Sequence, residues 1–422
     1  MTTSAPSGPP RGALLFIFIT VTLNSMGIGL IMPVMPDLLQ SMTGDLSNTG
    51  IGTAAAWGGW ITLSYAAMQF LFSPTLGNLS DAYGRRPVLL LSLFVMGVDY
   101  LIMAIAPTLI WLFIARMVAG AASATFSTAN AYIADISSPE KRAQNFGVTG
   151  AAFGVGFVLG PAIGGVVGEF GPRMPFYAAA ALTFANFLFG YLVLPESLQP
   201  EKRRKFQMAR ANSFGVALQM LKYPAVAWML LAMFVYNIAH YVYPVVWAYF
   251  AKAQLNWSPF DIGLSLAFVG VGFAVVQGFL IKYILAWLGS ARTAVLGLCL
   301  DVIALVGIAL ATEGWMVYAL MPVAALSALV APALQGLMSN KIPDDAQGEL
   351  QGAVSALSSL SFMITPILMT QLFFYFTAAT STIYFPGAPF IAAAVFSALA
   401  IWPLLHGAAL KDASLQSDSH VP

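Results

Sequence analysis

The sequence has little charge and almost no cysteine. Only 8% of its 422 residues are Asp, Glu, Lys or Arg, against about 25% in an ordinary soluble domain, so the chain lacks the polar surface of a cytosolic enzyme. Its single cysteine, Cys299, excludes an intrachain disulfide and a zinc cluster built on thiolates. The formal net charge of +1 argues against nucleic-acid binding. There is also no glycine-rich nucleotide loop that would couple the chain to ATP.

Apolar length is what the sequence has in abundance. Hydrophobic residues make up 59% of it, and the mean hydropathy is +0.81. Since about 20 apolar residues cross a bilayer as a helix, the apolar runs predict an all-α membrane protein with twelve transmembrane helices. They are expected near residues 13–39, 53–79, 87–106, 108–133, 144–168, 174–194, 224–250, 260–285, 292–312, 314–337, 349–376 and 385–408. We expect the first of them to be retained rather than cleaved as a signal peptide.

The basic residues predict orientation and domain division. With the N-terminus in the cytoplasm, fifteen Lys and Arg fall in cytoplasmic segments and two on the other side, so both termini are expected to be cytoplasmic. The longest polar stretch, 196–223, is predicted to be a cytoplasmic linker. It would join an N-terminal six-helix bundle at 1–195 to a C-terminal six-helix bundle with a short tail at 224–422.

Three charged residues, Asp99, Arg116 and Asp301, fall inside predicted spans. A charge at the bilayer centre costs at least about 2.5–3.5 kcal/mol, which makes each a candidate for function. Asp99 and Arg116 lie at matching depths on either side of a turn near Pro107. Their pairing is interpreted either as a structural link between helices or as a proton or cation site at Asp99 whose charge Arg116 senses. Asp301 has no basic residue nearby in its own helix, which predicts a role in coupling or in binding a cationic substrate.

Neutral polar side chains in the spans are expected to line a cavity for an organic substrate, although each is also suited to contacts between helices. The set consists of Asn24, Gln69, Asn130, Asn186, Asn237, His240, Gln277, Gln335 and Gln371. We give His240 no role as a proton carrier, because such a histidine more often packs between helices. Aromatic and methionine side chains would form the adaptable remainder of the cavity.

Two glycine-containing motifs stand out. The loop after the second span reads Gly77-Asn78-Leu79-Ser80-Asp81-Ala82-Tyr83-Gly84-Arg85-Arg86-Pro87. Gly77 is expected to permit close helix approach and Gly84 a chain reversal, while Asp81 would pair with an arginine or cap a helix, as a latch that forms and breaks. The fifth span contains Gly156-x-x-x-Gly160-Pro161-x-x-Gly164-Gly165, whose small residues favour close packing and whose proline interrupts the backbone ladder.

The first motif resembles the signature loop of the major facilitator superfamily, and the second resembles the motif associated with antiporters of that superfamily. Asp135 and Arg142 around the loop after the fourth span, and Glu196 after the sixth, agree with the same pattern. The residues expected to act in gating are therefore Gly77, Asp81, Gly84, Arg85, Arg86, Asp135, Arg142, Gly160, Pro161 and Glu196.

Within that superfamily the sequence is similar to the tetracycline/proton antiporters, in stretches such as 26–34, 84–93 and 332–336. The resemblance implies that Asp99, Asp301 and Arg116 serve proton coupling. Substrate contacts are expected from Asn24, Gln69, Asn130, Asn237, Phe273, Gln277 and Gln335. Two of these depart from the family: Asn24-Ser25 stands where the antiporters have an aspartate, and Phe273 where they often have a histidine. Asparagine does not titrate, so one protonation site of the family is missing.

The sequence thus predicts a non-enzymatic, monomeric transporter of a bacterial inner membrane, exporting an amphiphilic, tetracycline-like drug in exchange for protons. No cofactor or resident metal is expected, with a divalent cation able to travel with the substrate. Three alternatives stay open at this point. They are the same fold moving another metabolite or a sugar, including by uptake; a membrane-embedded enzyme, which would need clustered His, Asp or Glu at one depth; and a receptor that does not transport.

Overall fold

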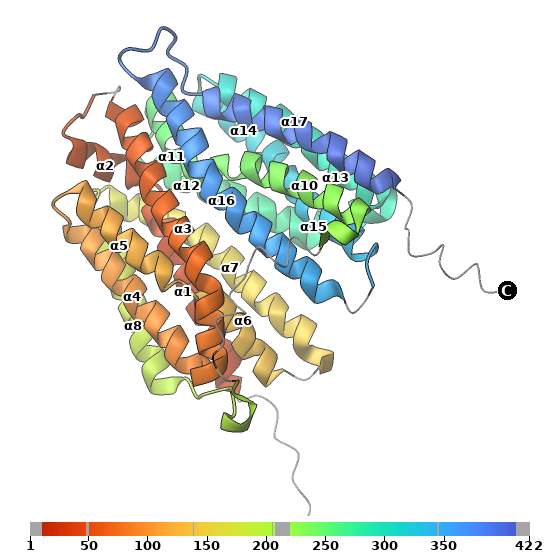
Figure 1. Ribbon diagram of the computed structural model, residues 1–422. Coiled ribbons are helices and arrows are strands. Elements are labelled where there is room, and N and C mark those ends of the chain that lie inside the picture. The colour runs from red at the N-terminus through yellow and green to blue at the C-terminus, as the bar shows by residue number, and fades with distance from the viewer. Residues whose placement is uncertain are drawn as a thin grey trace, which may run out of the picture. The chain divides into compact units, whose positions relative to one another are not determined.

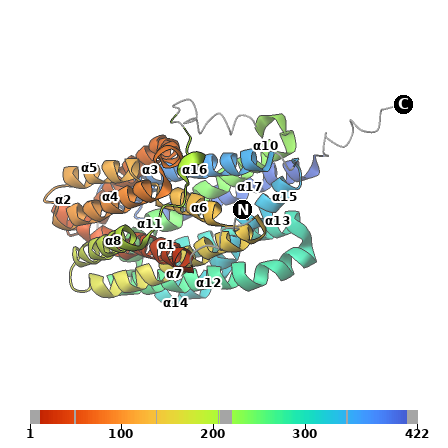
Figure 2. The same cartoon turned by 90° about the horizontal axis from the view of Figure 1, so that it is seen from below.

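A computed structural model of the chain describes residues 11–47, 50–137, 139–204, 206, 220–343 and 346–410. The described residues form helices joined by short connections, with no strand among them (Figures 1 and 2). Within these ranges, ten segments are long and apolar enough to cross a membrane. The all-helical membrane class is therefore confirmed, and the count of twelve crossings stays a prediction.

The helices follow the predicted spans closely in most places. The first part of the chain contains α1 (Arg11–Ile31), α2 (Met35–Thr43), α3 (Gly50–Tyr83), α4 (Arg85–Ile105), α5 (Leu109–Ala121), α6 (Thr125–Ile136), α7 (Pro139–Gly168) and α8 (Met174–Val193). The later part contains α10 (Pro224–His240), α11 (Val242–Leu255), α12 (Pro259–Val275), α13 (Ile281–Leu310), α14 (Gly314–Ala325), α15 (Val330–Ser339), α16 (Gln347–Thr377) and α17 (Ala388–Ala409). A five-residue π-helical turn, η4 (Val276–Leu280), joins α12 to α13, and a 3₁₀ turn, η5 (Leu326–Leu329), joins α14 to α15.

Four predicted spans prove to be broken rather than continuous. The breaks fall at 32–34, 122–124, 241 and 326–329, in the first and fourth span of each predicted six. Proline explains three of them, because it lacks the N–H that would bond four residues back: Pro33 precedes α2, Pro244 lies in the first turn of α11, and Pro332 follows the 3₁₀ turn. Nothing in the local sequence explains the break at 122–124.

The chain divides into two compact units, and each is described by itself. The first unit comprises residues 1–42, 64–211 and 257–267, and the second comprises 43–63, 212–256 and 268–422. The unit boundaries fall inside α3 and α12 as well as in the segment after α8. The division at the linker 196–223 stays a prediction, since half of that segment lies outside the described residues.

In the first unit, α1 packs along α7 and α4 along α8 (Figure 1). The contact of α1 with α7 is made through glycine: Gly156, Gly160 and Gly164 of α7 lie against backbone atoms of α1. A side chain at any of these positions would meet main-chain atoms rather than movable side-chain atoms. The second motif of the sequence therefore does what its small residues predict, and α7 continues as a helix through Pro161.

We expect Gly160→Ala to destabilise the protein by about 1–3 kcal/mol, the usual cost of overpacking. The added Cβ would lie 2.6 Å from the carbonyl oxygen of Met26 and 2.9 Å from the Cα of Gly29. Gly154→Ala is the matched control on the same helix, because a Cβ there meets nothing within 4 Å and alanine favours helix over glycine. Thermal unfolding in detergent should show a lower midpoint for the first variant only. Equal midpoints would contradict the packing account.

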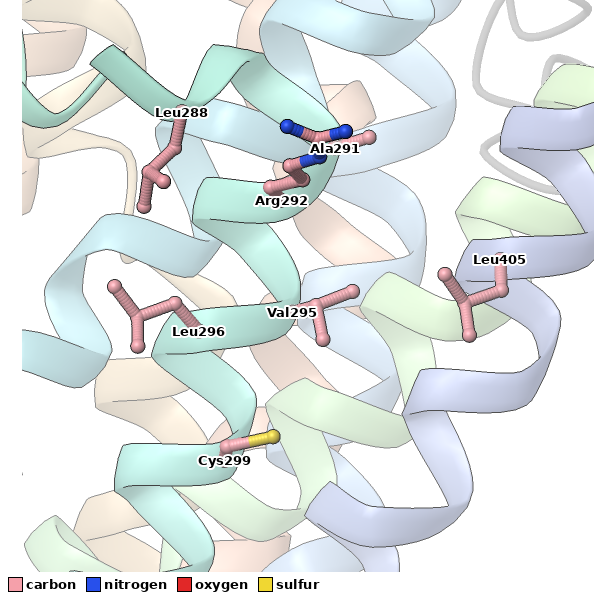
Figure 3. A pocket seen from close by; sticks show the side chains of 7 residues that line it. All are labelled: Leu288, Ala291, Arg292, Val295, Leu296, Cys299 and Leu405. Atoms are coloured by element: carbon pink, nitrogen blue, oxygen red, sulfur yellow. The ribbon is translucent and has the colours of Figure 1, made fainter.

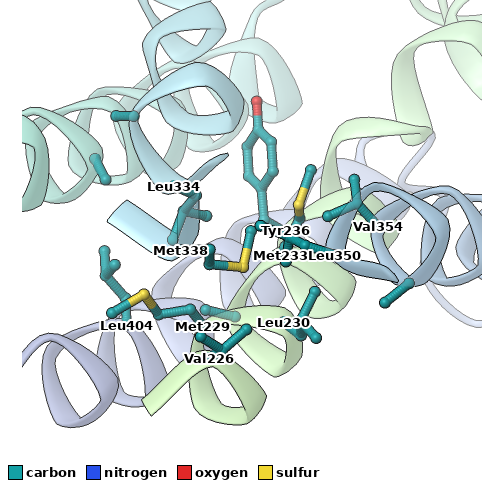
Figure 4. Close-up of a cluster of buried hydrophobic side chains, with 14 of the residues drawn as sticks. Val226, Met229, Leu230, Met233, Tyr236, Leu334, Met338, Leu350, Val354 and Leu404 are labelled. Atoms are coloured by element: carbon teal, nitrogen blue, oxygen red, sulfur yellow. The ribbon is translucent and has the colours of Figure 1, made fainter. Parts of the chain in front are cut away.

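In the second unit, α17 packs along α10 and α13, and α16 packs on α10 and α11. The core of this unit is rich in methionine: Met229, Met233 and Met338 pack with Leu334 around Tyr236 (Figure 4). Unbranched thioether side chains fill irregular gaps between helices without a fixed shape. This core fixes Tyr236 at the inner face of α10.

Candidate functional site

Asp99 of α4 and Arg116 of α5 form a buried ion pair. The Nε of Arg116 donates a hydrogen bond of 3.1 Å to Oδ1 of Asp99, and its Nη2 contacts Oδ2. Only 2% of the Asp99 side chain and 11% of the Arg116 side chain are exposed. The short turn between α4 and α5 brings the two residues to the same level, as their similar distances from Pro107, eight residues before it and nine after it, predict. The carboxylate is thus compensated by a full opposite charge.

Aromatic and polar side chains complete the surroundings of Arg116. The guanidinium lies over the ring of Tyr65, 5.0 Å from its centroid, and 5.8 Å from that of Tyr100. The Tyr65 hydroxyl is 2.8 Å from Oγ of Ser123, which also accepts a hydrogen bond of 3.1 Å from Nε2 of Gln69. The predicted residue Gln69 therefore lies in the same cluster as the ion pair. Tyr65 and Ser123 were not among the predicted residues.

Asp301 of α13 is fully buried and has no basic partner among the described residues. Its Oδ2 accepts a hydrogen bond of 2.5 Å from Oγ of Ser397 on α17. Its Oδ1 and the hydroxyl of nearby Ser327 both lack a hydrogen bond of ordinary geometry within the described part of the chain. Burial of this carboxyl is thus accompanied only by neutral hydroxyl groups and by no counter-charge.

His240 occupies a cluster of rings near Asp301. Tyr236 and Tyr243 both interact electrostatically with Asp301. The Tyr236 hydroxyl donates to the carbonyl oxygen of Ser327 at 3.0 Å and lies 3.4 Å from Nδ1 of His240. The His240 ring is also 5.8 Å from that of Tyr243 and 5.9 Å from that of Phe273. The histidine is thus packed between aromatic rings, and the predicted substrate residue Phe273 belongs to the same cluster.

The other predicted substrate residues are distributed over both units. In the first unit Asn24 is buried in α1, and the side-chain oxygen of Asn130 accepts from Thr149 at 3.1 Å. In the second unit Asn237 donates to Oγ of Ser358 at 3.1 Å. Gln277 is exposed on the π-helical turn, and Gln335 is half-buried in α15. A pocket shared by residues of the two units stays a prediction.

The loop between α3 and α4 carries an ionic network. Arg85 contacts Asp81 at 2.5 Å through Nη1 and Asp135 at 3.0 Å through Nε. It also donates to Oγ of Ser80 at 3.0 Å, while Oγ of Ser197 donates to Asp135 at 3.1 Å. The Arg85 guanidinium therefore joins the end of α3 to the end of α6, and Ser197 links the segment after α8 to the same network through Asp135. The predicted pairing of Asp81 with an arginine is the one seen.

Glu196 caps the N-terminus of α4. Its Oε1 accepts from the backbone N–H of Arg85 at 2.8 Å and its Oε2 from that of Arg86 at 3.2 Å. These groups have no partner within the helix, and a carboxylate complements the positive end of the helix dipole. Gly84 makes the approach possible, because its φ of 111° suits glycine and a Cβ there would collide with the Glu196 carboxylate. The chain reversal expected at Gly84 is present.

The expected roles of Gly77 and Arg142 are not seen in the described residues. The close approach expected at Gly77 is not seen, because a Cβ at that position would meet no atom within 4 Å. Helix α3 instead makes its close glycine contacts in its first half, where Gly52 and Gly59 face Thr377 and Thr370 of α16. The side chain of Arg142 lies outside the described residues.

No metal centre is present in the described part of the chain: it has no group of three or more His, Cys, Asp or Glu side chains able to hold a metal ion. The carboxylates are instead separated into the Asp99 pair, the isolated Asp301 and the loop network. At each of these places the carboxylates make hydrogen bonds or ion pairs with neighbouring side chains.

This fold is that of membrane transport proteins. The solved structure of the human organic anion transporter MFSD10 matches with a TM-score of 0.69 and 21% sequence identity, covering 94% of this chain and 100% of that chain. The nucleoside transporter NupG matches with a TM-score of 0.74 and 12% identity, covering 94% and 98%. At these identities the likeness establishes the fold alone.

Sequence comparison is more specific. Residues 17–366 match the Major Facilitator Superfamily. The tetracycline resistance protein of class C from Escherichia coli is 40% identical over 367 residues, which span 86% of this chain and 90% of that protein. The class G protein from Vibrio anguillarum is 36% identical over 370 residues, spanning 86% and 91%. The chain therefore belongs to the major facilitator superfamily and is a multi-pass membrane transport protein, not an enzyme.

Proposed function

We propose that this protein exports an amphiphilic, tetracycline-like drug across a bacterial inner membrane in exchange for protons, by alternating access. Twelve crossings in two six-helix bundles, both termini in the cytoplasm and a monomeric state belong to the same proposal. The identity to tetracycline resistance proteins supports the direction and the class of substrate. The excess of fifteen basic residues over two supports the orientation.

The contrast between the two intramembrane aspartates carries the proposal. Asp99 has a guanidinium partner, so its charge is balanced within the unit. Asp301 has only neutral hydroxyl groups beside it, those of Ser397 and Ser327, and its Oδ1 is without an ordinary hydrogen bond among the described residues. A buried carboxyl without a counter-charge gains or loses a proton according to its access to water, which is what a coupling site requires. Asp301 is thus the proton carrier. The Asp99–Arg116 pair responds to the gain or loss of that proton or stabilises the helices while it occurs.

The network around Arg85 would act as a latch between conformations. Arg85 holds Asp81 and Asp135 at the surface end of three helices, and Glu196 holds the start of α4. Contacts of this kind between partly exposed charges are individually weak, about 0–1 kcal/mol, so they are readily broken and reformed. A latch made of several such contacts favours one state without trapping the protein in it.

Two residues shape the expectation for the substrate. Asn24 is buried and neutral, and Phe273 lies beside His240 in the ring cluster. A tetracycline-like compound carrying a divalent cation would meet fewer charged groups here than in the antiporters that have a carboxylate and a histidine at these positions. Contacts from aromatic rings and amides would therefore provide a larger part of the recognition.

Proton-driven transport by the purified protein tests this proposal. Proteoliposomes with an acidic interior, supplied with tetracycline and Mg²⁺ outside, should accumulate the drug as protons leave. Accumulation should stop when a proton-conducting ionophore removes the gradient, and protein-free liposomes give the background from passive partition. The same assay with a sugar should show no accumulation.

Two results would contradict the proposal. Accumulation that persists after the proton gradient is collapsed would exclude proton coupling. Gradient-dependent movement of a sugar with no movement of tetracycline or other amphiphilic drugs would replace drug efflux with metabolite transport on the same fold.

A further inference from the structure

A shallow groove lies on the second unit between α13 and α17. Its volume is 460 Å³. Helix α13 contributes Leu288, Arg292, Val295, Leu296 and Cys299, and α17 contributes Leu405 (Figure 3). Arg292 lies at one end of the groove and Cys299 at the other, with apolar side chains between them (Figure 3). The groove is therefore apolar along its length, and the guanidinium of Arg292 lies just beyond one end of it (Figure 3).

The charged end of the groove is uncompensated. Gly289 has φ 72° and ψ 164°, so the helix is interrupted there and Arg292 falls in the first turn of the segment that follows. The first turn of a helix carries partial positive charge, which favours anions and disfavours another cation. Arg292 is exposed and forms no ion pair or hydrogen bond with the described residues. Two sources of positive potential thus coincide at this end.

The position of the groove restricts the anion that suits it. Pro259–Leu310 is an apolar stretch of 52 residues, longer than one crossing needs, and the interruption at Gly289 lies between its two predicted spans, 260–285 and 292–312. Arg292 is therefore expected at the membrane boundary, where the second of these spans begins. Seven residues separate Arg292 from Cys299, which corresponds to about 10 Å along a helix. A free phosphate would leave this apolar length empty. A phospholipid fills both parts at once.

We propose that this groove binds one acidic phospholipid, with its phosphate and headgroup at Arg292 and an acyl chain along Val295, Leu296, Cys299 and Leu405. Lipid tails gain little from leaving other lipid tails for an apolar helix surface. Selectivity therefore comes from the headgroup charge, as in basic pockets between membrane helices. The site belongs to α13 and α17 of the second unit and includes none of the residues assigned to proton coupling or substrate binding.

Lipid retention measured by native mass spectrometry tests the site. The full-length protein in detergent is incubated with equal amounts of phosphatidylglycerol and phosphatidylcholine, and the bound fraction of each is compared. Phosphatidylglycerol should be retained in preference, and Arg292→Gln should reduce that preference about fivefold, corresponding to about 1 kcal/mol for one basic group. Lys282→Gln is the matched control, since it removes the same charge from the helical segment before Gly289, outside the groove.

The only cysteine of the chain provides a test of the acyl position. Alkylation of Cys299 with a long-chain maleimide should fill the groove and displace the bound phosphatidylglycerol, whereas Cys299→Ala treated with the same reagent should retain it. Equal retention of the two lipids, an equal loss in Arg292→Gln and Lys282→Gln, or retention after alkylation would overturn the proposal. Displacement of the lipid by inorganic phosphate at matched concentration would also overturn it, by showing an anion site that needs no acyl chain.

Discussion

Asp301→Asn is expected to abolish proton-driven accumulation of substrate in proteoliposomes while the protein remains folded. Asparagine is close to aspartate in size and can still accept the hydrogen bond from Ser397, so the packing between α13 and α17 is kept. It cannot exchange a proton, so the step that couples the two sides of the membrane is lost. Drug accumulation driven by an acidic interior should fall to that of protein-free liposomes. Undiminished active transport by Asp301→Asn would remove Asp301 from the mechanism.

Asp45→Asn is the control for that experiment. Asp45 lies in the loop between α2 and α3, where hydrogen bonds from the hydroxyl and the backbone N–H of Ser47 lower the pKa of its carboxyl. It therefore stays ionised at neutral pH and carries no proton through the cycle. The same chemical change at this position should leave proton-driven accumulation intact. A thermal midpoint for Asp301→Asn close to that of the unaltered protein would show that lost transport does not come from unfolding.

Arg116→Gln is expected to destabilise the protein by about 3–5 kcal/mol, because removing one partner of a buried pair leaves the other charge uncompensated. The carboxylate of Asp99 is 2% exposed and has no other cation near it in the described structure. Unfolding in detergent, followed by circular dichroism, should show a clearly lower midpoint. The loss of the stacking of Arg116 over Tyr65 contributes to the same effect.

The double variant Asp99→Asn with Arg116→Gln distinguishes the cost of an unpaired carboxylate from the cost of lost packing around the guanidinium. Two neutral amides can hydrogen-bond to each other, so most of the lost stability should return. If the double variant is as unstable as Arg116→Gln alone, the cost lies in packing around the guanidinium rather than in the unpaired carboxylate. If the double variant is stable and still transports, the pair is a structural link between α4 and α5, the first of the two interpretations that the sequence leaves open.

Pairs of interacting residues that lie close together in the sequence could be predicted from their spacing. Asp99 lies eight residues before Pro107 and Arg116 nine after it, and helices joined by a short turn bring such residues to one level. The ionic network of Arg85 with Asp81 lies within one turn of chain and has a recognisable pattern. The sequence also indicates a lone carboxyl at Asp301, since no basic residue of its own helix lies within two turns of it.

Contacts between helices that are far apart in the sequence could not be predicted from spacing. Ser397 is 96 positions from Asp301 on another helix, and one serine among many gives no signal of its partner. The same holds for Tyr65 and Ser123, which meet only because α3 crosses α5. The break at 122–124 contains no proline, so it depends on tertiary packing. The breaks beside Pro33 and Pro244 could have been predicted, because each proline interrupts an apolar run and lacks the N–H of a continuous helix.

The glycine contact between α1 and α7 has a mechanical consequence. Helices that slide past each other usually do so by switching side-chain rotamers at their interface. Gly156, Gly160 and Gly164 lie directly on the main chain of α1, so no side chains between the two helices can change rotamer to allow sliding. The two helices must therefore move together as one rigid unit. Asn24 on α1 then keeps its position relative to α7 in every conformation.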